Sequence, residues 1–229
     1  MDGRPDFLMY MQAKKVRIKI CCISSAAEVG LAVRYGASAL GLVSAMPSGP
    51  GVVSEDTIAR LARIIPPGIS SFLLTSKQVG NEIVAQQKAC GTNTLQLVDA
   101  VPQLEVESVR DQLPGIKIVQ VVHVAGEESL LEAETVLPHA DALLLDSGNP
   151  NLQIKELGGT GRVHNWEISR EIVSRSSKPV YLAGGLNPSN VAEAIDIVRP
   201  FGVDICSGVR KNGRLDESLL RDFIKSCGY

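Results

Sequence analysis

The sequence predicts a single (β/α)8 barrel, and two observations carry this prediction. Short apolar runs recur along the chain, and each is followed by a longer segment whose apolar residues are three or four positions apart, as in an amphipathic helix. The apolar runs are continuous rather than alternating, which is typical of parallel strands covered by helices on both faces. Eight such units in 229 residues fit a closed barrel better than an open doubly wound sheet.

The predicted strands are the apolar runs, taken in order. They cover residues 16–23, 39–43, 70–75, 94–98, 117–124, 140–146, 179–182 and 203–206. The predicted helices follow them, at residues 25–35, 55–65, 81–89, 101–113, 127–137, 166–174, 189–198 and 217–227. Most strands begin about two dozen residues after the previous one, the length of one strand–helix unit. No linker divides the chain, so we expect residues 16–229 to form one barrel domain and residues 1–15 to be a short N-terminal extension.

Composition excludes several functional classes. The net charge is −2 and no basic block occurs, which argues against nucleic acid or anionic lipid as a partner. No apolar stretch approaches the roughly 18 residues of a membrane helix, and the first 15 residues do not resemble a signal peptide. The five cysteines lack C-x-x-C spacing and only three histidines are present. We therefore expect no zinc site and a reduced, cytoplasmic setting.

Candidate chemistry lies at the ends of the predicted strands, because a barrel gathers these ends at one mouth. Cys21 is near the end of the first strand and Asp146 ends the sixth, so they can form a general acid–base pair there. Each alone more often has a structural role, as a buried small hydrophobe or a loop residue. Lys19 shares the inward face of its strand with Cys21, where it can offset a carboxylate or hold a thiolate. Cys22 is expected to point the other way and pack.

Glycine clusters follow the last three predicted strands, at residues 157–161, 183–187 and 206–209. Glycines after the seventh and eighth strands of a barrel let backbone N–H groups converge on a phosphate. The alternative is that these glycines only form tight turns. Three clusters at late strand ends favour phosphate binding. The clusters are not nucleotide loops, because G-x-G-x-x-G after a strand and GK[ST] are both absent.

In this order, the motifs resemble those of the phosphoribosylanthranilate isomerase family of tryptophan biosynthesis, over nearly the whole chain after Lys15. The resemblance is carried by residues 19–21, 144–147, 158–161 before Asn165-Trp166, 182–191, 202–205, 207–209 and Gly213 before Asp216. It implies an Amadori rearrangement of N-(5'-phosphoribosyl)anthranilate, in which an aspartate opens the ribose ring and a cysteine removes the C2' proton. No cofactor or metal is implied. The expected partner is a small phosphorylated sugar amine, and the expected assembly is a monomer or a homodimer.

Carried over to this chain, the resemblance makes Asp146 the acid and Cys21 the base. Backbone groups of the glycine clusters would hold the 5'-phosphate and border the sugar. The predicted binding residues are Lys19, Gly159, Gly161, Gly184, Gly185, Ser207, Gly208 and Arg210.

The chain departs from the family pattern at the end that would bind the aromatic acid. Cys22 replaces a glycine, residues 47–54 lack the family's Ser-Pro-Arg arginine, and residues 96–99 lack the histidine of Q-L-H-G. Arg210 replaces the glutamate of S-G-V-E, so one positive charge is lost and another gained. We therefore hypothesise that Arg210 binds the anthranilate carboxylate. The alternatives are a paralogue that isomerises a different phosphosugar and a barrel that only binds a phosphosugar or a partner; retention of Cys21 and Asp146 favours catalysis.

Overall fold

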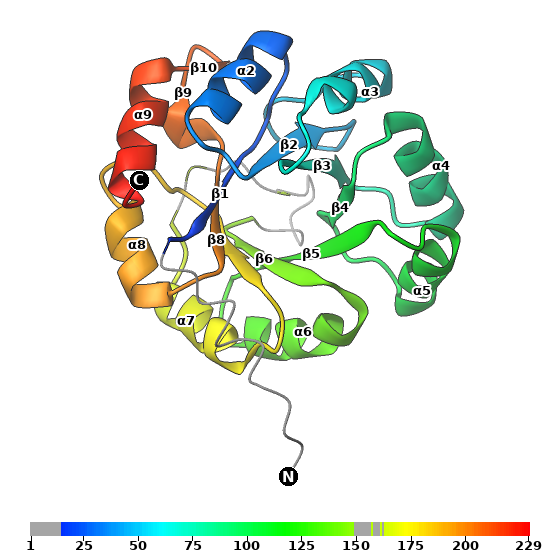
Figure 1. Ribbon diagram of the computed structural model, residues 1–229. Coiled ribbons are helices and arrows are strands. Elements are labelled where there is room, and N and C mark those ends of the chain that lie inside the picture. Colours follow the sequence, from blue (N-terminus) through cyan, green and yellow to red (C-terminus); the bar gives the residue numbers. More distant parts are fainter. Residues whose placement is uncertain (1–14, 149–156, 158–160, 162) are drawn as a thin grey trace, which may run out of the picture.

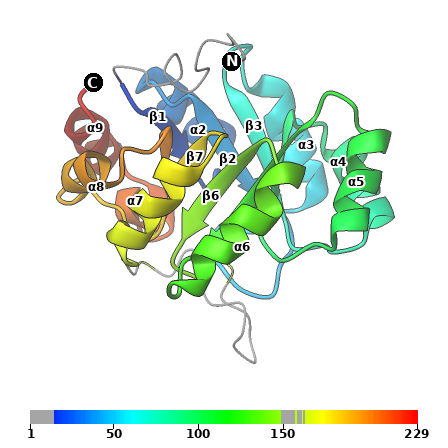
Figure 2. The same ribbon diagram turned by 90° about the horizontal axis from the view of Figure 1, so that it is seen from below.

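The computed structural model describes residues 15–148, 157, 161 and 163–229 of the chain. Eight parallel strands pair in chain order and close into a barrel through the pairing of β1 with β8. The helices form a ring outside the strands (Figures 1 and 2). The prediction of a (β/α)8 barrel is confirmed. Residues 1–14 of the predicted N-terminal extension lie outside the described residues.

The strands are short and buried. They are β1 (Arg17–Ile20), β2 (Ala39–Val43), β3 (Ser70–Thr75), β4 (Thr94–Leu97), β5 (Lys117–His123), β6 (Ala142–Asp146), β7 (Val180–Leu182) and β8 (Gly202–Ile205). Every residue of β2, β4, β6, β7 and β8 is buried. Burial on both faces explains why these strands are continuous apolar runs in the sequence. β1 ends at Ile20, three residues before the predicted end at residue 23.

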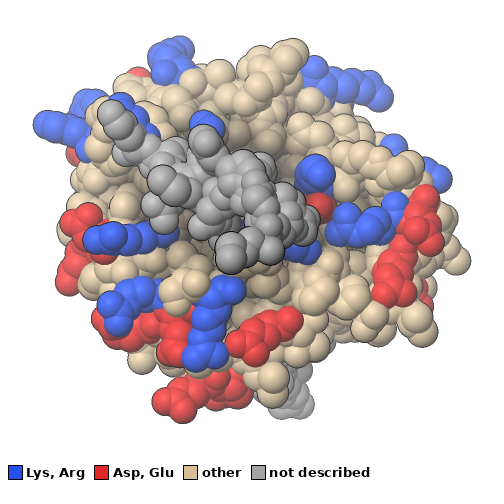
Figure 3. Space-filling model, turned by 60° about the horizontal axis from the view of Figure 1, so that its bottom comes forward, with Lys and Arg blue, Asp and Glu red and all other residues tan. Residues whose placement is uncertain are grey.

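The helices are α2 (Ala26–Arg34), α3 (Glu55–Ile64), α4 (Gly80–Cys90), α5 (Gln103–Gln112), α6 (Glu128–Val136), α7 (Trp166–Arg175), α8 (Val191–Val198) and α9 (Glu217–Ser226). Ser25, Ser54, Asn165 and Asp216 precede α2, α3, α7 and α9, and each side chain accepts a hydrogen bond from a backbone N–H of the first turn. Such caps satisfy N–H groups that a helix start leaves unpaired. Within the described residues, no helix is long and apolar enough to cross a membrane. Charges of both signs are interspersed on the side shown in Figure 3.

Two short elements follow β8, in a stretch for which the sequence predicts neither a strand nor a helix. A single 3-10 turn, η2 (Ser207–Val209), leads into a hairpin formed by β9 (Arg210–Lys211) and β10 (Arg214–Leu215). Asn212 and Gly213 connect the two strands with φ angles of 50° and 76°. The Asn-Gly pair is a strong hairpin signal, since both positions require positive φ. This hairpin fixes the direction in which Arg210 leaves the barrel end.

The barrel interior contains aromatic and charged side chains as well as the expected aliphatic ones. Tyr181 contacts Phe72 and Phe201 edge to face, with ring centroids 6.1 and 5.4 Å apart. A Cβ at Gly202 would lie 2.5 Å from the Tyr181 ring, so this glycine makes room for the aromatic stack.

A buried ion pair crosses the seam at which the barrel closes. Lys19 on β1 and Asp204 on β8 are register partners, and Lys19 Nζ lies 2.8 Å from Asp204 Oδ2. Lys19 is fully buried and Asp204 is 8% exposed. Burial lowers the pKa of Lys19, but the Asp204 carboxylate and Cys21 outweigh this effect, so the pKa is raised and the side chain is charged. A buried charge persists only when it is paired, which makes the pair a constraint on how β1 meets β8.

Replacement of one partner of this pair is expected to destabilise the fold. Lys19→Met leaves the Asp204 carboxylate buried without its cation, and we expect the free energy of unfolding to fall by about 3–5 kcal/mol. The measurement is equilibrium denaturation in urea. The double variant Lys19→Met/Asp204→Asn removes both charges and should recover most of the loss. Equal unfolding midpoints for the wild type and Lys19→Met would contradict the argument.

Candidate active site

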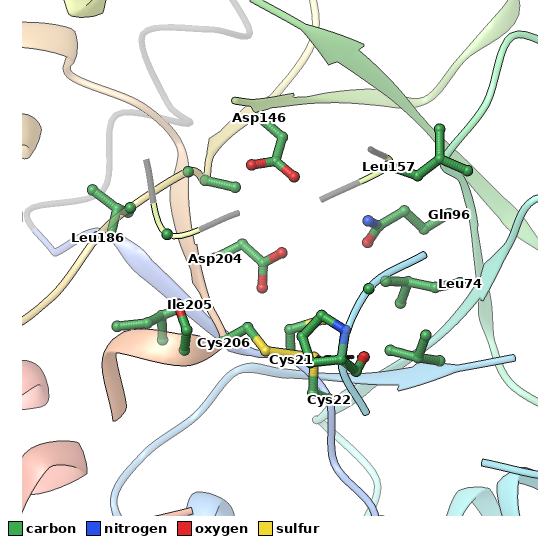
Figure 4. Close-up of a pocket in the computed structure, with 18 of the residues that line it drawn as sticks. Cys21, Cys22, Leu74, Gln96, Asp146, Leu157, Leu186, Asp204, Ile205 and Cys206 are labelled. Carbon is green, nitrogen blue, oxygen red and sulfur yellow. Dashed lines mark hydrogen bonds between the residues drawn. A yellow bond between two sulfur atoms is a disulfide. The ribbon is translucent and has the colours of Figure 1, made fainter. Parts of the chain in front are cut away.

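A pocket lies at the carboxyl ends of the strands, and residues from both ends of the chain line it (Figure 4). It brings together six of the residues selected from the sequence: Cys21, Asp146, Gly161, Gly184, Gly185 and Ser207. Strand ends converge there because all eight strands of the barrel run in parallel. Gly159 lies outside the described residues. The roles of these residues in a reaction stay predictions.

Cys21 follows β1 and lines the pocket with a buried side chain. Its backbone N–H donates to the carbonyl of Ile205, which holds it against the end of β8. A Cβ at Gly41 would lie 2.8 Å from Cys21 Sγ and 3.1 Å from Lys19 Nζ, so this glycine of β2 leaves space for both groups. Burial raises the pKa of the Cys21 thiol to about 11, and the nearby Lys19 ammonium acts in the opposite direction. The thiol is therefore protonated at neutral pH.

Asp146, the last residue of β6, is 8% exposed. Burial raises the pKa of its carboxyl group, while the hydrogen bond from the backbone N–H of Ser147 to Oδ1 (2.7 Å) lowers it. The net shift is upward, which favours a carboxyl group that keeps its proton. His123 is its register partner on β5, but His123 Nε2 pairs with the carbonyl of Val98 and the ring does not line the pocket.

Asp204 also lines the pocket, and the sequence reasoning missed it as a site residue. In Figure 4 its carboxylate lies between Asp146 and the cysteines. Asp204 Oδ2 accepts from Lys19, whereas Oδ1 is buried and has no hydrogen-bond partner in the described part of the chain. The signal that could have found it is an acidic residue within the apolar run 203–206. A buried carboxylate oxygen without a partner is available to a ligand hydroxyl group.

The turns after β7 and β8 form another side of the pocket. Gly184 and Gly185 have φ angles of 81° and 63°, a conformation that side-chain-bearing residues rarely adopt. The N–H groups of Gly184, Gly185 and Ser207 donate to no other backbone group of the described residues. Gly208 does not line the pocket; a Cβ there would collide with the carbonyl of Leu186, so this glycine lets the two turns touch. Donors grouped in this way can hold an anion.

Cys22 and Cys206 form a disulfide next to the pocket, which corrects the expectation that the cysteines are all reduced. Cys21, Cys90 and Cys227 are free. The sequence predicts that Cys22 lies within the first strand. Its backbone instead leaves the strand, with a φ of 62°. The two cysteines are 184 positions apart, and only closure of the barrel brings β1 beside β8. Local spacing in the sequence carries no trace of this pairing.

Lys19 and Arg210 are not among the described residues that line the pocket, and the substrate contacts expected of them stay predictions. Lys19 is fully buried inside the barrel, where it pairs with Asp204. Arg210 donates to Glu28 Oε1 (2.9 Å) and to the carbonyls of Cys21 (3.0 Å), Cys22 (2.6 Å) and Gly213 (3.1 Å). Its terminal nitrogens are thus used within the fold, because the hairpin turns its side chain toward the end of β1. The hypothesis that Arg210 binds the anthranilate carboxylate therefore requires these contacts to rearrange.

Comparison with known proteins decides the family. The family model of N-(5'-phosphoribosyl)anthranilate (PRA) isomerase matches residues 18–226. The chain belongs to the phosphoribosylanthranilate isomerase family. N-(5'-phosphoribosyl)anthranilate isomerase 2 of Methanosarcina mazei is 36% identical over 211 residues, which cover 91% of this chain and 92% of that protein. The isomerase of Methanocella arvoryzae is 32% identical, with coverage of 91% and 96%.

Solved structures of the family agree with the fold. Phosphoribosyl anthranilate isomerase of Thermotoga maritima superimposes with a TM-score of 0.79 and 29% identity, covering 93% of this chain and 98% of the other. A phosphoribosyl anthranilate isomerase in complex with reduced 1-(o-carboxyphenylamino)-1-deoxyribulose 5-phosphate gives a TM-score of 0.78 at 27% identity, with the same coverage. The resemblance identified from the sequence motifs is confirmed.

The loop after β2 forms one wall of the pocket. Met46, Ser48, Gly49 and Pro50 line the pocket from this loop, and Gln96 at the end of β4 lines it from the side (Figure 4). Among the lining residues that the structure describes, none is Lys, Arg or His. Over the same described ranges, no group of three His, Cys, Asp or Glu side chains is placed to hold a metal ion.

The pH dependence of Cys21 alkylation tests the electrostatics of the site. Only the thiolate reacts with iodoacetamide, so a pKa of about 11 predicts a rate that rises about tenfold per pH unit from about pH 7 to about pH 10. Mass spectrometry of the peptide containing Cys21 measures this rate, and Cys21→Ala identifies the signal. A rate that levels off near pH 8.5 would show an ordinary thiol and contradict the effect of burial.

Proposed function

We propose that the chain isomerises N-(5'-phosphoribosyl)anthranilate to 1-(o-carboxyphenylamino)-1-deoxyribulose 5-phosphate, with Asp146 as the general acid and Cys21 as the general base. The observation that carries this proposal is that both side chains line one pocket together with the turns after β7 and β8. Membership of the isomerase family supports it, as does the solved relative that holds the reduced form of that ketose. This reaction is a step of tryptophan biosynthesis.

The first step is opening of the ribose ring. Asp146 donates its proton to the ring oxygen, the C1'–O bond breaks, and the nitrogen lone pair forms a C=N bond to C1'. Burial, which raises the pKa of Asp146, keeps the proton on the carboxyl group until the substrate accepts it. The hydrogen bond from Ser147 then stabilises the carboxylate that is left.

The second step is removal of the C2' proton by the Cys21 thiolate, which forms when the Cys21 thiol releases its proton to water. The electrons of the C2'–H bond form a C1'=C2' double bond and neutralise the iminium nitrogen. The resulting enolamine tautomerises to the ketose when C1' gains a proton and the C2' hydroxyl loses one. Lys19 acts through Cys21 here: its buried ammonium stabilises the thiolate, which burial alone would disfavour. No step of this sequence requires a cofactor.

Substrate binding uses the remaining groups of the pocket. The N–H groups of Gly184, Gly185 and Ser207 are free to hold the 5'-phosphate. Asp204 Oδ1 accepts a hydrogen bond from a sugar hydroxyl, since no described residue occupies this oxygen. Gly161 borders the sugar from the segment after β6.

A second candidate substrate is favoured by one observation. The described lining residues carry two carboxylates, Asp146 and Asp204, and no cation, so the ring carboxylate of anthranilate meets no described partner of opposite charge. A phosphoribosyl amine whose nitrogen substituent lacks a carboxylate would fit this end of the pocket, with the same acid–base pair. A barrel that only binds a phosphosugar is disfavoured, because binding does not require that pair.

Removal of either proton-transferring group is expected to abolish turnover. Phosphoribosylanthranilate is generated in the cuvette and its loss of fluorescence is followed. Cys21→Ala and Asp146→Asn should each lower kcat by roughly 10²- to 10⁴-fold, the range for loss of one general acid or base. Cys227→Ala, outside the pocket, should retain activity, and thermal unfolding should show that every variant is folded.

The outcomes separate the candidates. Activity that survives both substitutions would expose a contaminating host enzyme. No turnover by the wild type, combined with stabilisation by inorganic phosphate, would move the assignment to the second candidate substrate.

A further inference from the structure

The Cys22–Cys206 disulfide joins the two halves of the proposed active site. Cys22 directly follows Cys21, the proposed base, and Cys206 directly precedes Ser207, which belongs to the proposed phosphate turn. Both cysteines also line the pocket (Figure 4). The bond therefore connects the group that removes a proton with the backbone that anchors the substrate.

The backbone at Cys22 depends on its surroundings. Its φ of 62° lies in the left-handed region, which residues with a side chain adopt only when neighbouring structure holds them there. A Cβ at Gly51 would collide with Cys22, so the loop after β2 is packed directly on this residue. Loss of the cross-link would free both the backbone of Cys22 and the loop that covers it.

The pocket also contains a hydrogen-bond acceptor for Cys22 in its reduced, thiol form. The Cys22 sulfur lies 3.5 Å from the carbonyl oxygen of Pro50, to which a thiol can donate a hydrogen bond and a disulfide cannot. Arg210 holds the carbonyls of Cys21 and Cys22 and is itself anchored by Glu28. These contacts do not require the disulfide, so reduction should loosen the end of β1 without unfolding the barrel.

We propose that the Cys22–Cys206 disulfide is a positioning element of the isomerase site, and that its reduction lowers catalytic efficiency by letting the base and the phosphate turn move apart. The inference rests on the proposed function. Closure of the bond breaks two S–H bonds and forms one S–S bond, and the two electrons and two protons pass to a small-molecule disulfide, which becomes two thiols. A dithiol reverses the reaction and becomes a cyclic disulfide.

The test compares the two forms of the full chain. Protein is oxidised with glutathione disulfide or reduced with dithiothreitol, and alkylation in denaturant followed by mass spectrometry should label three cysteines in the first case and five in the second. We expect kcat/KM to be roughly tenfold to 100-fold lower in the reduced form, through a lower kcat and a higher KM, since small misplacements of reacting groups have effects of this size. A purely structural disulfide would change thermal stability without this change in KM.

Variants assign the effect to the bond. Cys22→Ser and Cys206→Ser should each behave like the reduced form and lose the response to oxidant. Cys90→Ser is the matched control, because Cys90 is free and outside the pocket, and it should keep the response. Equal kcat/KM in the two forms, full efficiency in Cys206→Ser, or five alkylated cysteines after oxidation would each overturn the proposal.

Turnover tests the proposed function, and phosphate affinity tests the role of the disulfide separately. If neither form turns over phosphoribosylanthranilate, the proposed function is wrong, and the affinity for inorganic phosphate decides the role of the disulfide. Weaker phosphate binding by the reduced form than by the oxidised form supports the positioning role. Equal affinities overturn it.

Discussion

The ion pair between Lys19 and Asp204 is the interaction on which the rest of the site depends. It lies inside the barrel at the seam of β1 and β8, where neither charge is stable without the other. The pair fixes the two strands that carry Cys21 and the turn of Ser207. It also places an ammonium group near the Cys21 thiol and leaves the second oxygen of Asp204 without a partner among the described residues. The Lys19–Asp204 pair therefore both holds the barrel closed and supports the proposed proton transfer.

The same burial acts on both proposed catalytic groups, and its consequences differ. It raises the pKa of Asp146, which suits an acid that must hold its proton at neutral pH. It also raises the pKa of Cys21, which opposes the role of a base. Lys19 reduces this second cost, because its ammonium group stabilises the thiolate that must form before the C2' proton is removed. Two buried groups in one pocket therefore require a nearby buried cation for only one of them, the base.

The sequence indicates the barrel well, because strands buried on both faces are continuous apolar runs, as in β2 and β6. The sequence also predicts that Cys21 and Asp146 lie at the same mouth of the barrel, since the ends of parallel strands converge there. It fails where a feature depends on closure of the ring or on the direction of a turn. The Cys22–Cys206 bond joins residues that only the β1–β8 seam brings together, and the hairpin after η2 turns Arg210 onto backbone carbonyls. The role of Asp204 was missed because its pairing with Lys19 depends on the same closure of the ring.

The most direct measurement of the central claim, that one anchored sugar lies between a thiol and a carboxyl group, is a crystal structure with reduced 1-(o-carboxyphenylamino)-1-deoxyribulose 5-phosphate bound. The account requires the phosphate against the N–H groups of Gly185 and Ser207, and the sugar carbons between Cys21 Sγ and the Asp146 carboxyl group. Binding of the compound outside this pocket, or with its phosphate at the loop after β2, would contradict it.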